Sequence, residues 1–323
     1  MIKLLNEQPE MGKVEMRTAY INALAAAARD DDRVVAINCD LSSSMGTVPF
    51  TEEFPSRAIN VGIAEANGCG VAAGLSATGL IPFFHSFAVF SSRRICDQIF
   101  QSCAYAGLNV KIIGGDAGVS AASNGGTHMA FEDVGVLRSL PTVTIVEPSD
   151  TTMMTKLVPM IKDMYGVVYM RTPRKQVYDI YNPSSEFEIG KAALLKEGSD
   201  VTLIASGMLV ALALQAAEAL KADGINARVV DMFTIKPIDV ECIVDSVEKT
   251  GAIVTLENHN IIGGLGSAVA EVLGEHAPAP LVRVGVPDVF GEVGDQDYLM
   301  SRFGFTVENV SEQTKLAISR KKG

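Results

Sequence analysis

Cysteine and long apolar runs are scarce in this 323-residue sequence. The five cysteines are odd in number and include no Cys-x-x-Cys pair, which argues against a disulfide framework and against a zinc site of that type. No stretch approaches the 18 or so apolar residues of a transmembrane helix. The N-terminal segment lacks the apolar core of a signal peptide. We therefore expect reduced thiols and a cytoplasmic protein without a membrane partner.

Basic residues are also few relative to acidic ones. The chain has 27 Lys and Arg against 38 Asp and Glu, for a net charge of −11. Such an acidic protein repels the phosphates of nucleic acids and of anionic membranes, so we expect no nucleic-acid partner. With 48% hydrophobic and 20% charged residues, the composition is that of a globular protein with large cores. The length allows two domains.

Apolar runs of strand length alternate with helix-length periodic segments in the first half of the chain. We expect strands over 33–38, 57–61, 81–85, 109–114, 142–147 and 167–171. Helices are expected over 14–29, 64–78, 89–106, 131–139 and 149–164. Continuous rather than alternating apolar character indicates strands buried on both faces, as in a parallel sheet covered by helices.

The pattern is interrupted between residues 174 and 198, where tyrosines, a proline and charges follow no sustained period. We divide the chain into a first domain over 1–175, a linker over 176–198 and a second domain over 199–323. Strands of the second domain are expected over 200–206, 226–232, 252–257 and 281–286, and helices over 208–222, 238–248, 265–275 and 305–319. The predicted fold class is α/β, with two consecutive domains, each a mostly parallel sheet flanked by helices.

Residues with chemical potential follow several strands of the first domain. In open α/β sheets, ligands bind beyond the carboxyl ends of the strands. Asp40, Glu65, His85 and the loop 114–128 occupy such positions. Each single residue is equally explained by an ordinary role, such as a turn cap or a hydrogen-bonded core histidine. The Gly/Ala/Ser-rich loop is more informative, because loops of that length in compact domains are usually functional.

The segment INVGIAEANGCGVAAG (59–74) places a lone acid, Glu65, at the start of a glycine-rich helix. Each interior glycine costs a helix about 1 kcal/mol relative to alanine. We interpret this Gly/Ala surface as made for close approach of neighbouring backbone or of another domain.

A second glycine-rich segment, GGLGSA (263–268), opens a predicted helix after a predicted strand. It superficially matches a dinucleotide-binding fingerprint. Its spacing is not Gly-x-Gly-x-x-Gly, and five residues separate it from the strand, so nicotinamide binding is a minor alternative.

Three long motifs carry a family resemblance. The segments INVGIAEANGCGVAAGL, PFFHSFAVFSSRRICDQI and GVSAASNGGTHMAFEDVGVLRSLPTVTIVEPSD resemble the pyrimidine-binding domain of transketolases. The segments DMFTIKPID and ENHNIIGGLGSAVAEVL resemble the transketolase C-terminal domain. The motifs occur in the family's order and the resemblance covers nearly the whole chain. The same two-domain unit forms β subunits of 2-oxo-acid dehydrogenases and part of deoxyxylulose-phosphate synthase.

Transketolases of full length begin with a further domain that binds the diphosphate and metal through Gly-Asp-Gly and a following Asn. Here Gly115-Asp116 is followed by Ala117, and no other candidate exists. The resemblance therefore implies the C-terminal subunit of a split transketolase, which moves a two-carbon ketol unit between sugar phosphates, as in the pentose phosphate reactions. It implies thiamine diphosphate, with Mg²⁺ or Ca²⁺ held mainly by an N-terminal partner subunit, in a heterotetramer of two plus two chains. No metal ligand is assigned to this chain.

The resemblance gives Glu65 the central role, since the corresponding carboxyl group hydrogen-bonds N1′ of the cofactor's aminopyrimidine. Phe87 and Phe90 match the aromatic pair that packs on this ring, although ordinary core packing would explain them as well. We assign Arg93 to the same pocket; Arg94 is the alternative, because the segment ICDQI is one residue longer than in some relatives.

On the substrate side, the resemblance implies that His128 contacts the oxygens of the ketose donor. Further implied contacts are Asp40 near the cofactor, and Ser44, Arg17 and Arg171 at the sugar phosphate. From its place beside the aromatic pair, we also expect His85 to contact the substrate. Arginine suits phosphate because its planar fork donates to two oxygens at once.

Two positions depart from the family pattern. Asn124 replaces an Asp that reads the C2 hydroxyl of the sugar, and Asp116 stands where a His often assists phosphate binding. An anion at Asp116 would repel phosphate. The sugars are therefore expected to differ from the common pentose-phosphate pair. A 2-oxo-acid dehydrogenase β subunit and a non-catalytic module that retains the fold are the remaining alternatives.

Overall fold

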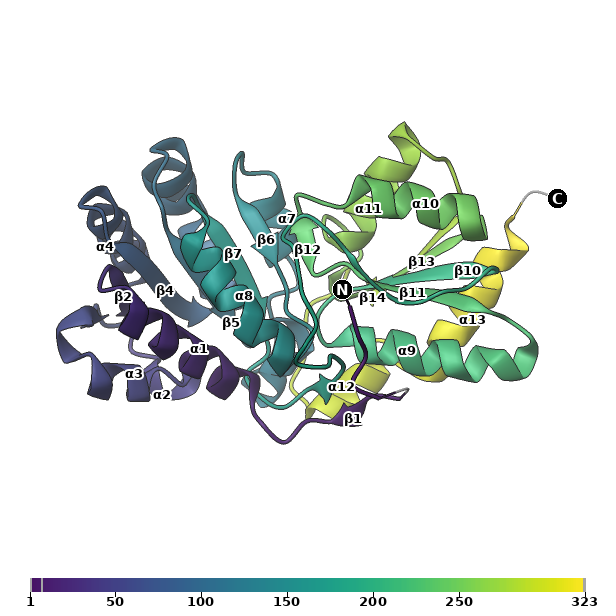
Figure 1. Ribbon diagram of the computed structural model, residues 1–323, viewed down its shortest axis with the longest axis horizontal. Coiled ribbons are helices and arrows are strands. Elements are labelled where there is room, and N and C mark those ends of the chain that lie inside the picture. The colour runs from purple at the N-terminus through teal and green to yellow at the C-terminus, as the bar shows by residue number, and fades with distance from the viewer. Residues whose placement is uncertain (1, 7, 322–323) are drawn as a thin grey trace.

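Two sheets organise residues 2–6 and 8–321, the part of the chain that the computed structural model describes (Figure 1). The first sheet has the order β12 (Thr234–Lys236), β6 (Thr144–Val146), β7 (Val168–Thr172), β5 (Lys111–Gly115), β4 (Ile81–Phe87), β2 (Val34–Asn38) and β3 (Ala58–Asn60). The second has the order β14 (Leu281–Val286), β13 (Ile253–Asn260), β10 (Val201–Ala205), β11 (Ala227–Asp231) and β9 (Ala193–Lys196). A small antiparallel pair joins β1 (Glu10–Met11) to β8 (Tyr178–Asp179).

All strands except β12 in the first sheet and β9 in the second pair in parallel with their sheet neighbours. Each residue of the central strands β2, β4, β5 and β7 is buried, as their continuous apolar sequences predict. The predicted fold class, two mostly parallel sheets flanked by helices, is confirmed.

Helices cover both faces of each sheet. Those of the first half are α1 (Met16–Asp30), α2 (Ser42–Met45), α3 (Val48–Glu53), α4 (Glu65–Ala77), α5 (Ala88–Ser91), α6 (Cys96–Gln98), α7 (Asp133–Arg138) and α8 (Thr151–Asp163), with short helices η1 (Pro55–Arg57), η2 (Arg93–Ile95), η3 (Ile99–Tyr105) and η4 (Gly118–Asn124). Helices α1 and α8 pack against each other on one face, and α4 packs in a separate core on the other.

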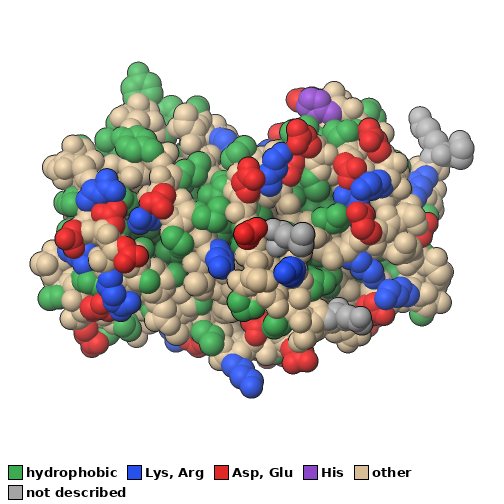
Figure 2. All heavy atoms as spheres, viewed as in Figure 1, with side chains coloured by type: hydrophobic (Ala, Val, Ile, Leu, Met, Phe, Trp, Pro, Cys, Tyr) green, Lys and Arg blue, Asp and Glu red, His purple; other side chains and the backbone are tan. Residues whose placement is uncertain are grey.

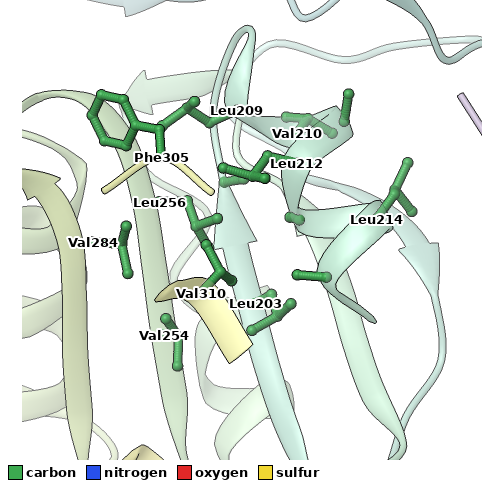
Figure 3. Packing of buried hydrophobic residues seen from close by; sticks show 14 of the residues in the cluster. Leu203, Leu209, Val210, Leu212, Leu214, Val254, Leu256, Val284, Phe305 and Val310 are labelled. Atoms are coloured by element: carbon green, nitrogen blue, oxygen red, sulfur yellow. The ribbon is translucent and has the colours of Figure 1, made fainter. Parts of the chain in front are cut away.

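The second half contains α9 (Leu209–Leu220), η5 (Lys221–Asp223), α10 (Val240–Thr250), α11 (Leu265–Glu275), α12 (Gln296–Arg302) and α13 (Val307–Ser319). Leucines of α9 and Val310 of α13 meet Leu203, Val254 and Leu256 of the strands in one core (Figure 3). Helices α10 and α11 line the opposite core. None of the described helices is long and apolar enough to cross a membrane.

The helix predicted over 89–106 is interrupted at Ser92, whose backbone leaves the helical region (φ −125°, ψ −83°). Beyond it the chain forms η2, α6 and the π-helix η3. A π-helix holds more residues per turn than an α-helix, so it accommodates a segment with one additional residue. This break decides how Arg93 and Arg94 are oriented.

The predicted linker 176–198 contains the strands β8 and β9, and β9 belongs to the second sheet. The two halves are therefore joined more closely than a linker suggests. Strand β12 leaves the second domain and pairs with β6 at the edge of the first sheet. Gly118 lies so near the second domain that a Cβ there would be 2.1 Å from the Asn258 amide oxygen.

The surface is mixed in charge. Figure 2 shows acidic and basic side chains interspersed over one face of the described residues, so the acidic excess is not gathered into a single patch on that face. All five cysteines are free, and three of them (Cys39, Cys69 and Cys103) are buried.

The glycines of α4 differ in their surroundings. A Cβ on Gly68 would lie 2.9 Å from the Phe84 ring and 3.1 Å from Val61, whereas one on Gly70 would meet nothing within 4 Å. We expect Gly68→Ala to destabilise the isolated chain by about 1–3 kcal/mol through overpacking. Gly70→Ala should stabilise it by roughly 0.5–1 kcal/mol, because alanine is the better helix former.

Urea unfolding of the two variants checks this pair of predictions. Equal effects of both substitutions would contradict the packing described for α4.

Candidate functional site

One edge of the first sheet gathers the polar residues of the first domain. Strands β2, β3, β4, β5 and β7 run in parallel, so their carboxyl ends meet at that edge. Asp40, Glu65, Phe87, Asp116 and Arg174 lie at or shortly after these ends. This is the place where open α/β sheets bind ligands.

Glu65 is the first residue of α4 and is only 3% exposed. Its Oε2 accepts a hydrogen bond of 2.9 Å from Nη1 of Arg94, and its Oε1 accepts one of 3.4 Å from the Ser86 hydroxyl. The start of a helix favours a negative charge, because unpaired backbone N–H groups point toward it. The carboxyl group is thus held at a fixed position beside the end of β4.

The Arg94 guanidinium lies over one of three aromatic rings that contact each other. Its Cζ is 3.8 Å from the centroid of the Phe90 ring, a cation–π contact. The His128 ring packs edge-on against Phe90 at 5.3 Å and against Phe87 at 6.1 Å between centroids. Glu65, Arg94, Phe90, His128 and Phe87 therefore form one continuous cluster, which we call the Glu65 cluster.

A second group lines a narrow pocket beside it, at the end of the adjacent strand β5. Arg17, Ser44, Asp116 and Arg174 contribute to this pocket, which we call the Arg17 pocket. Nη1 of Arg17 donates to the Ser44 carbonyl at 3.2 Å, and its Nε donates to Glu15 at 2.7 Å. Nη2 of Arg174 lies 2.9 Å from Oδ2 of Asp116.

Arg171 lies elsewhere, and this corrects its predicted phosphate contact. Its side chain is 1% exposed and donates to Asp133 at 2.8 Å, to Glu147 at 2.7 Å and to the Asn258 carbonyl at 3.0 Å. A buried guanidinium that is paired at all three nitrogens is committed to the protein and not to a ligand. Arg174, three residues further along the chain, is the arginine that faces the pocket.

His85 is also misplaced by the sequence prediction. It is fully buried, with Nε2 2.7 Å from the Tyr20 hydroxyl and Nδ1 3.0 Å from the Ile37 carbonyl. Burial lowers the pKa of His85 to about 4, so the ring is neutral at pH 7. The neutral ring donates through Nδ1 and accepts from Tyr20 at Nε2, so neither ring nitrogen is available to a substrate.

Arg94, the alternative to Arg93, is the arginine that lies in the Glu65 cluster. Arg93 donates to Glu132 at 2.6 Å, and its side chain is 55% exposed. Arg94 instead contacts Glu65 and Phe90. No simple sequence signal separates Arg93 from Arg94, because the helix is interrupted at Ser92, between Phe90 and the two arginines.

Asp40 and Asn124 are both exposed and belong to neither group. The backbone N–H of Asp40 donates to the Asn60 side chain at 3.0 Å, and its φ of 61° is left-handed. Asn124 ends the short helix η4 in the loop 114–128. Their predicted contacts with cofactor and sugar stay predictions.

The glycine-rich start of α11 does not offer a dinucleotide site. The Glu257 carboxylate already accepts from the backbone N–H groups of Leu265 at 2.6 Å and Gly266 at 2.9 Å. A phosphate bound at a helix N-terminus needs those same donors. The chain's own side chain therefore occupies the place, and the nicotinamide alternative is not supported.

Comparison with known proteins agrees with this geometry. Residues 12–179 match the family described as transketolase, pyrimidine binding domain, and residues 190–310 match transketolase, C-terminal domain. The chain belongs to the transketolase family. The 6-deoxy-6-sulfo-D-fructose transketolase subunit SqwH of Clostridium sp. (strain MSTE9) is 49% identical to it over 97% of this chain and 98% of that protein.

Two further relatives of this transketolase-type chain match along most of their length. A subunit of the apulose-4-phosphate transketolase of Phocaeicola vulgatus is 38% identical, over 92% of this chain and 95% of that protein. A solved structure described as "Split gene transketolase, inactive beta4 tetramer" has a TM-score of 0.89 and 43% identity, over 96% of this chain and 100% of its own. By contrast, human transketolase (38% identical) is matched over 43% of its length. The chain is thus a split-transketolase type of subunit.

Membership in the transketolase family implies thiamine diphosphate as cofactor, and the Glu65 cluster fits its pyrimidine ring. The guanidinium of Arg94 is a flat cation that stacks on Phe90 and donates to a buried carboxylate. A protonated aminopyrimidine, also flat, needs the same two partners. The Arg94 side chain is 45% exposed and can therefore swing away. Among residues 2–6 and 8–321, no three His, Cys, Asp or Glu side chains are grouped so as to hold a metal ion.

Proposed function

We propose that this chain is the C-terminal subunit of a thiamine-diphosphate-dependent transketolase that transfers a two-carbon ketol unit from a ketose to an aldose. The observation that carries the proposal is the Glu65 cluster, in which a buried carboxylate and an aromatic face already hold a flat cation. When bound, thiamine diphosphate supplies the electron sink for the carbon–carbon chemistry. The chain's residues supply orientation and proton control.

Glu65 would hold a proton at N1′ of the aminopyrimidine, because its carboxylate is fixed and shielded from water. Phe90 and Phe87 would support the ring. His128 packs edge-on against both phenylalanines and is partly exposed, so it would reach the oxygens of the ketose. Thr127 orients the His128 ring through a contact of 2.9 Å between its hydroxyl and Nδ1.

A partner subunit would supply the diphosphate-binding and metal-binding residues, with Mg²⁺ or Ca²⁺ as the ion. Two relatives that match along nearly their whole length are named as transketolase subunits, and a similar solved structure is described as a split gene transketolase in an inactive beta4 tetramer. The exposed face of α4 and the loop before it support such a contact: Gly70 and Gly74 have open space before them, and Ile63 in the loop is 78% exposed. A heterotetramer of two plus two chains in the cytoplasm is the arrangement we propose.

The sugar would carry an anionic group at the end remote from the transferred carbons. Arg17, Ser44 and Arg174 would bind that group in the Arg17 pocket. The relative with 49% identity is named for 6-deoxy-6-sulfo-D-fructose, a ketose that ends in a sulfonate. We propose a sugar of this class as the donor.

Ketol transfer by the reconstituted enzyme tests the proposal. The chain is mixed with a candidate N-terminal subunit, thiamine diphosphate, Mg²⁺, 6-deoxy-6-sulfo-D-fructose or a ketose phosphate, and an aldose phosphate. Transfer that requires both subunits supports it. Decarboxylation of pyruvate or of branched 2-oxo acids in place of transfer would support the dehydrogenase alternative, and absence of cofactor binding would favour a non-catalytic module.

Arg94→Met should tighten the binding of thiamine diphosphate to the two-subunit enzyme. The wild-type guanidinium must leave Glu65 and Phe90 before the ring can enter, and a partly exposed ion pair with a cation–π contact is worth about 1–2 kcal/mol. The dissociation constant is therefore expected to fall about fivefold to thirtyfold in calorimetric titration.

Arg93→Met is the matched control for this experiment, because Arg93 pairs with Glu132 and does not touch Glu65. It should leave the affinity for thiamine diphosphate unchanged. Weaker binding by Arg94→Met would mean that Arg94 holds the cofactor and does not compete with it.

A further inference from the structure

The charges of the Arg17 pocket are balanced in an unusual way for a site that binds an anion. Each of the two guanidinium groups has its own carboxylate: Glu15 lies 2.7 Å from Arg17, and Asp116 lies 2.9 Å from Arg174. Lys175, which is exposed, is a further cation that acts on Asp116. An anion that enters the pocket must therefore be attracted by the two guanidinium groups while two carboxylates repel it.

Of the two carboxylates, Asp116 matters more for a ligand. It is 1% exposed, whereas the Glu15 side chain is 29% exposed and is screened by water. Apart from Arg174, neither oxygen of Asp116 has a hydrogen-bond partner among residues 2–6 and 8–321. Its backbone is in the left-handed region, with φ 54°, which turns the side chain into the pocket beyond β5. Burial of a carboxylate with so few hydrogen-bond partners is unfavourable, so its presence at this position calls for a specific explanation.

We propose that Asp116 makes the pocket selective for sugars that end in a singly charged anion, such as a sulfonate, over sugars that end in a phosphate. The inference rests on the proposed function and deepens it. At pH 7 a sulfonate carries one negative charge, whereas a phosphate monoester carries about 1.5 to 2. Because charge repulsion grows with the ligand's charge and is only weakly screened at a buried site, Asp116 penalises the phosphate more.

The pair 6-deoxy-6-sulfo-D-fructose and fructose 6-phosphate probes this effect, since the two ketoses differ only at C6, where one carries a sulfonate bonded to carbon and the other a phosphate joined through an oxygen. For the wild-type two-subunit enzyme we expect the higher kcat/KM with the sulfonate. Asp116→Asn keeps the shape of the side chain and tolerates the positive φ. It should raise the ratio of kcat/KM for phosphate over sulfonate by about 10–100-fold, mainly through the KM of the phosphate.

Asp163→Asn is the matched control. It removes the same charge from a 70% exposed position at the end of α8, remote from the pocket, and should leave the ratio unchanged. An unchanged ratio in Asp116→Asn, or an equal loss with both ketoses, would overturn the proposal, because either result means a structural role for Asp116. A wild-type enzyme that prefers fructose 6-phosphate would overturn it while leaving ketol transfer established. No transfer from any ketose would instead refute the proposed function itself.

Discussion

Glu65→Gln should reduce ketol transfer by the two-subunit enzyme by about 10²–10⁴-fold, the range typical for loss of a group that controls a proton. Glutamine has the same shape and can still accept a hydrogen bond from Ser86. It carries no charge, so it cannot share a proton with N1′ of the aminopyrimidine. Glu65→Ala should reduce turnover at least as far.

The fold should survive both substitutions. The partner that Glu65 leaves behind, Arg94, is 45% exposed, so water solvates the unpaired guanidinium. Steady-state kinetics measures the loss of activity, and thermal melting of the same preparations checks that the fold is retained. Ser92→Ala offers a neighbouring control, because the Ser92 hydroxyl donates to the Ala88 carbonyl and does not touch Glu65. Retained activity in Glu65→Gln would refute the role of Glu65.

Arg171→Met is expected to lower the free energy of unfolding by about 3–5 kcal/mol, because it leaves Asp133 and Glu147 buried without their cation. Burial by itself would raise the pKa of Asp133, but the Arg171 guanidinium, together with His259 and the Tyr169 hydroxyl, outweighs burial and holds that pKa below its ordinary value. The expected fall in melting temperature is on the order of 10 °C. Arg171→Lys keeps the charge but not the planar fork, so its free energy of unfolding should lie between those of the wild type and of Arg171→Met.

Arg29→Met provides the surface control. Arg29 makes two hydrogen bonds of 2.7 Å to Glu53, but both side chains are exposed to water, so its loss should leave the melting temperature close to that of the wild type. Calorimetric melting of the isolated chain compares the three variants. An Arg171→Met chain that melts with the wild type, while the KM for the sugar rises, would restore the phosphate-binding role predicted from the sequence.

The strands and most helices were predictable because their signals are local. Runs such as VVAIN in β2 and VTLIA in β10 are buried at every position, which fits only strands covered on both faces. Strands β9 and β12 were missed, since each is short and is stabilised by pairing with a distant segment. The break at Ser92 also has no simple local signal in the sequence, and the segment η3 beyond it packs against α4.

The site was predictable in outline and less so in detail. The resemblance placed Glu65, Phe87, Phe90 and His128 in one site, and three of these are joined by ring contacts in the structure. The arginines were harder to assign. Arg93 and Arg94 are adjacent, and in the segment RTPR an error of three residues moves the assignment from Arg174 in the pocket to Arg171 in the core. Burial separates Arg171 from Arg174, and burial follows from the packing of the two domains.

Titration of thiamine diphosphate, in the presence of Mg²⁺, is the measurement that tests the central claim most directly. It should be made with the chain alone, with the N-terminal subunit alone, and with their mixture. The account predicts tight binding in the mixture only, and weaker binding when the mixture contains Glu65→Gln. Binding by the chain alone that equals binding by the mixture, or a mixture that binds no cofactor, would contradict it.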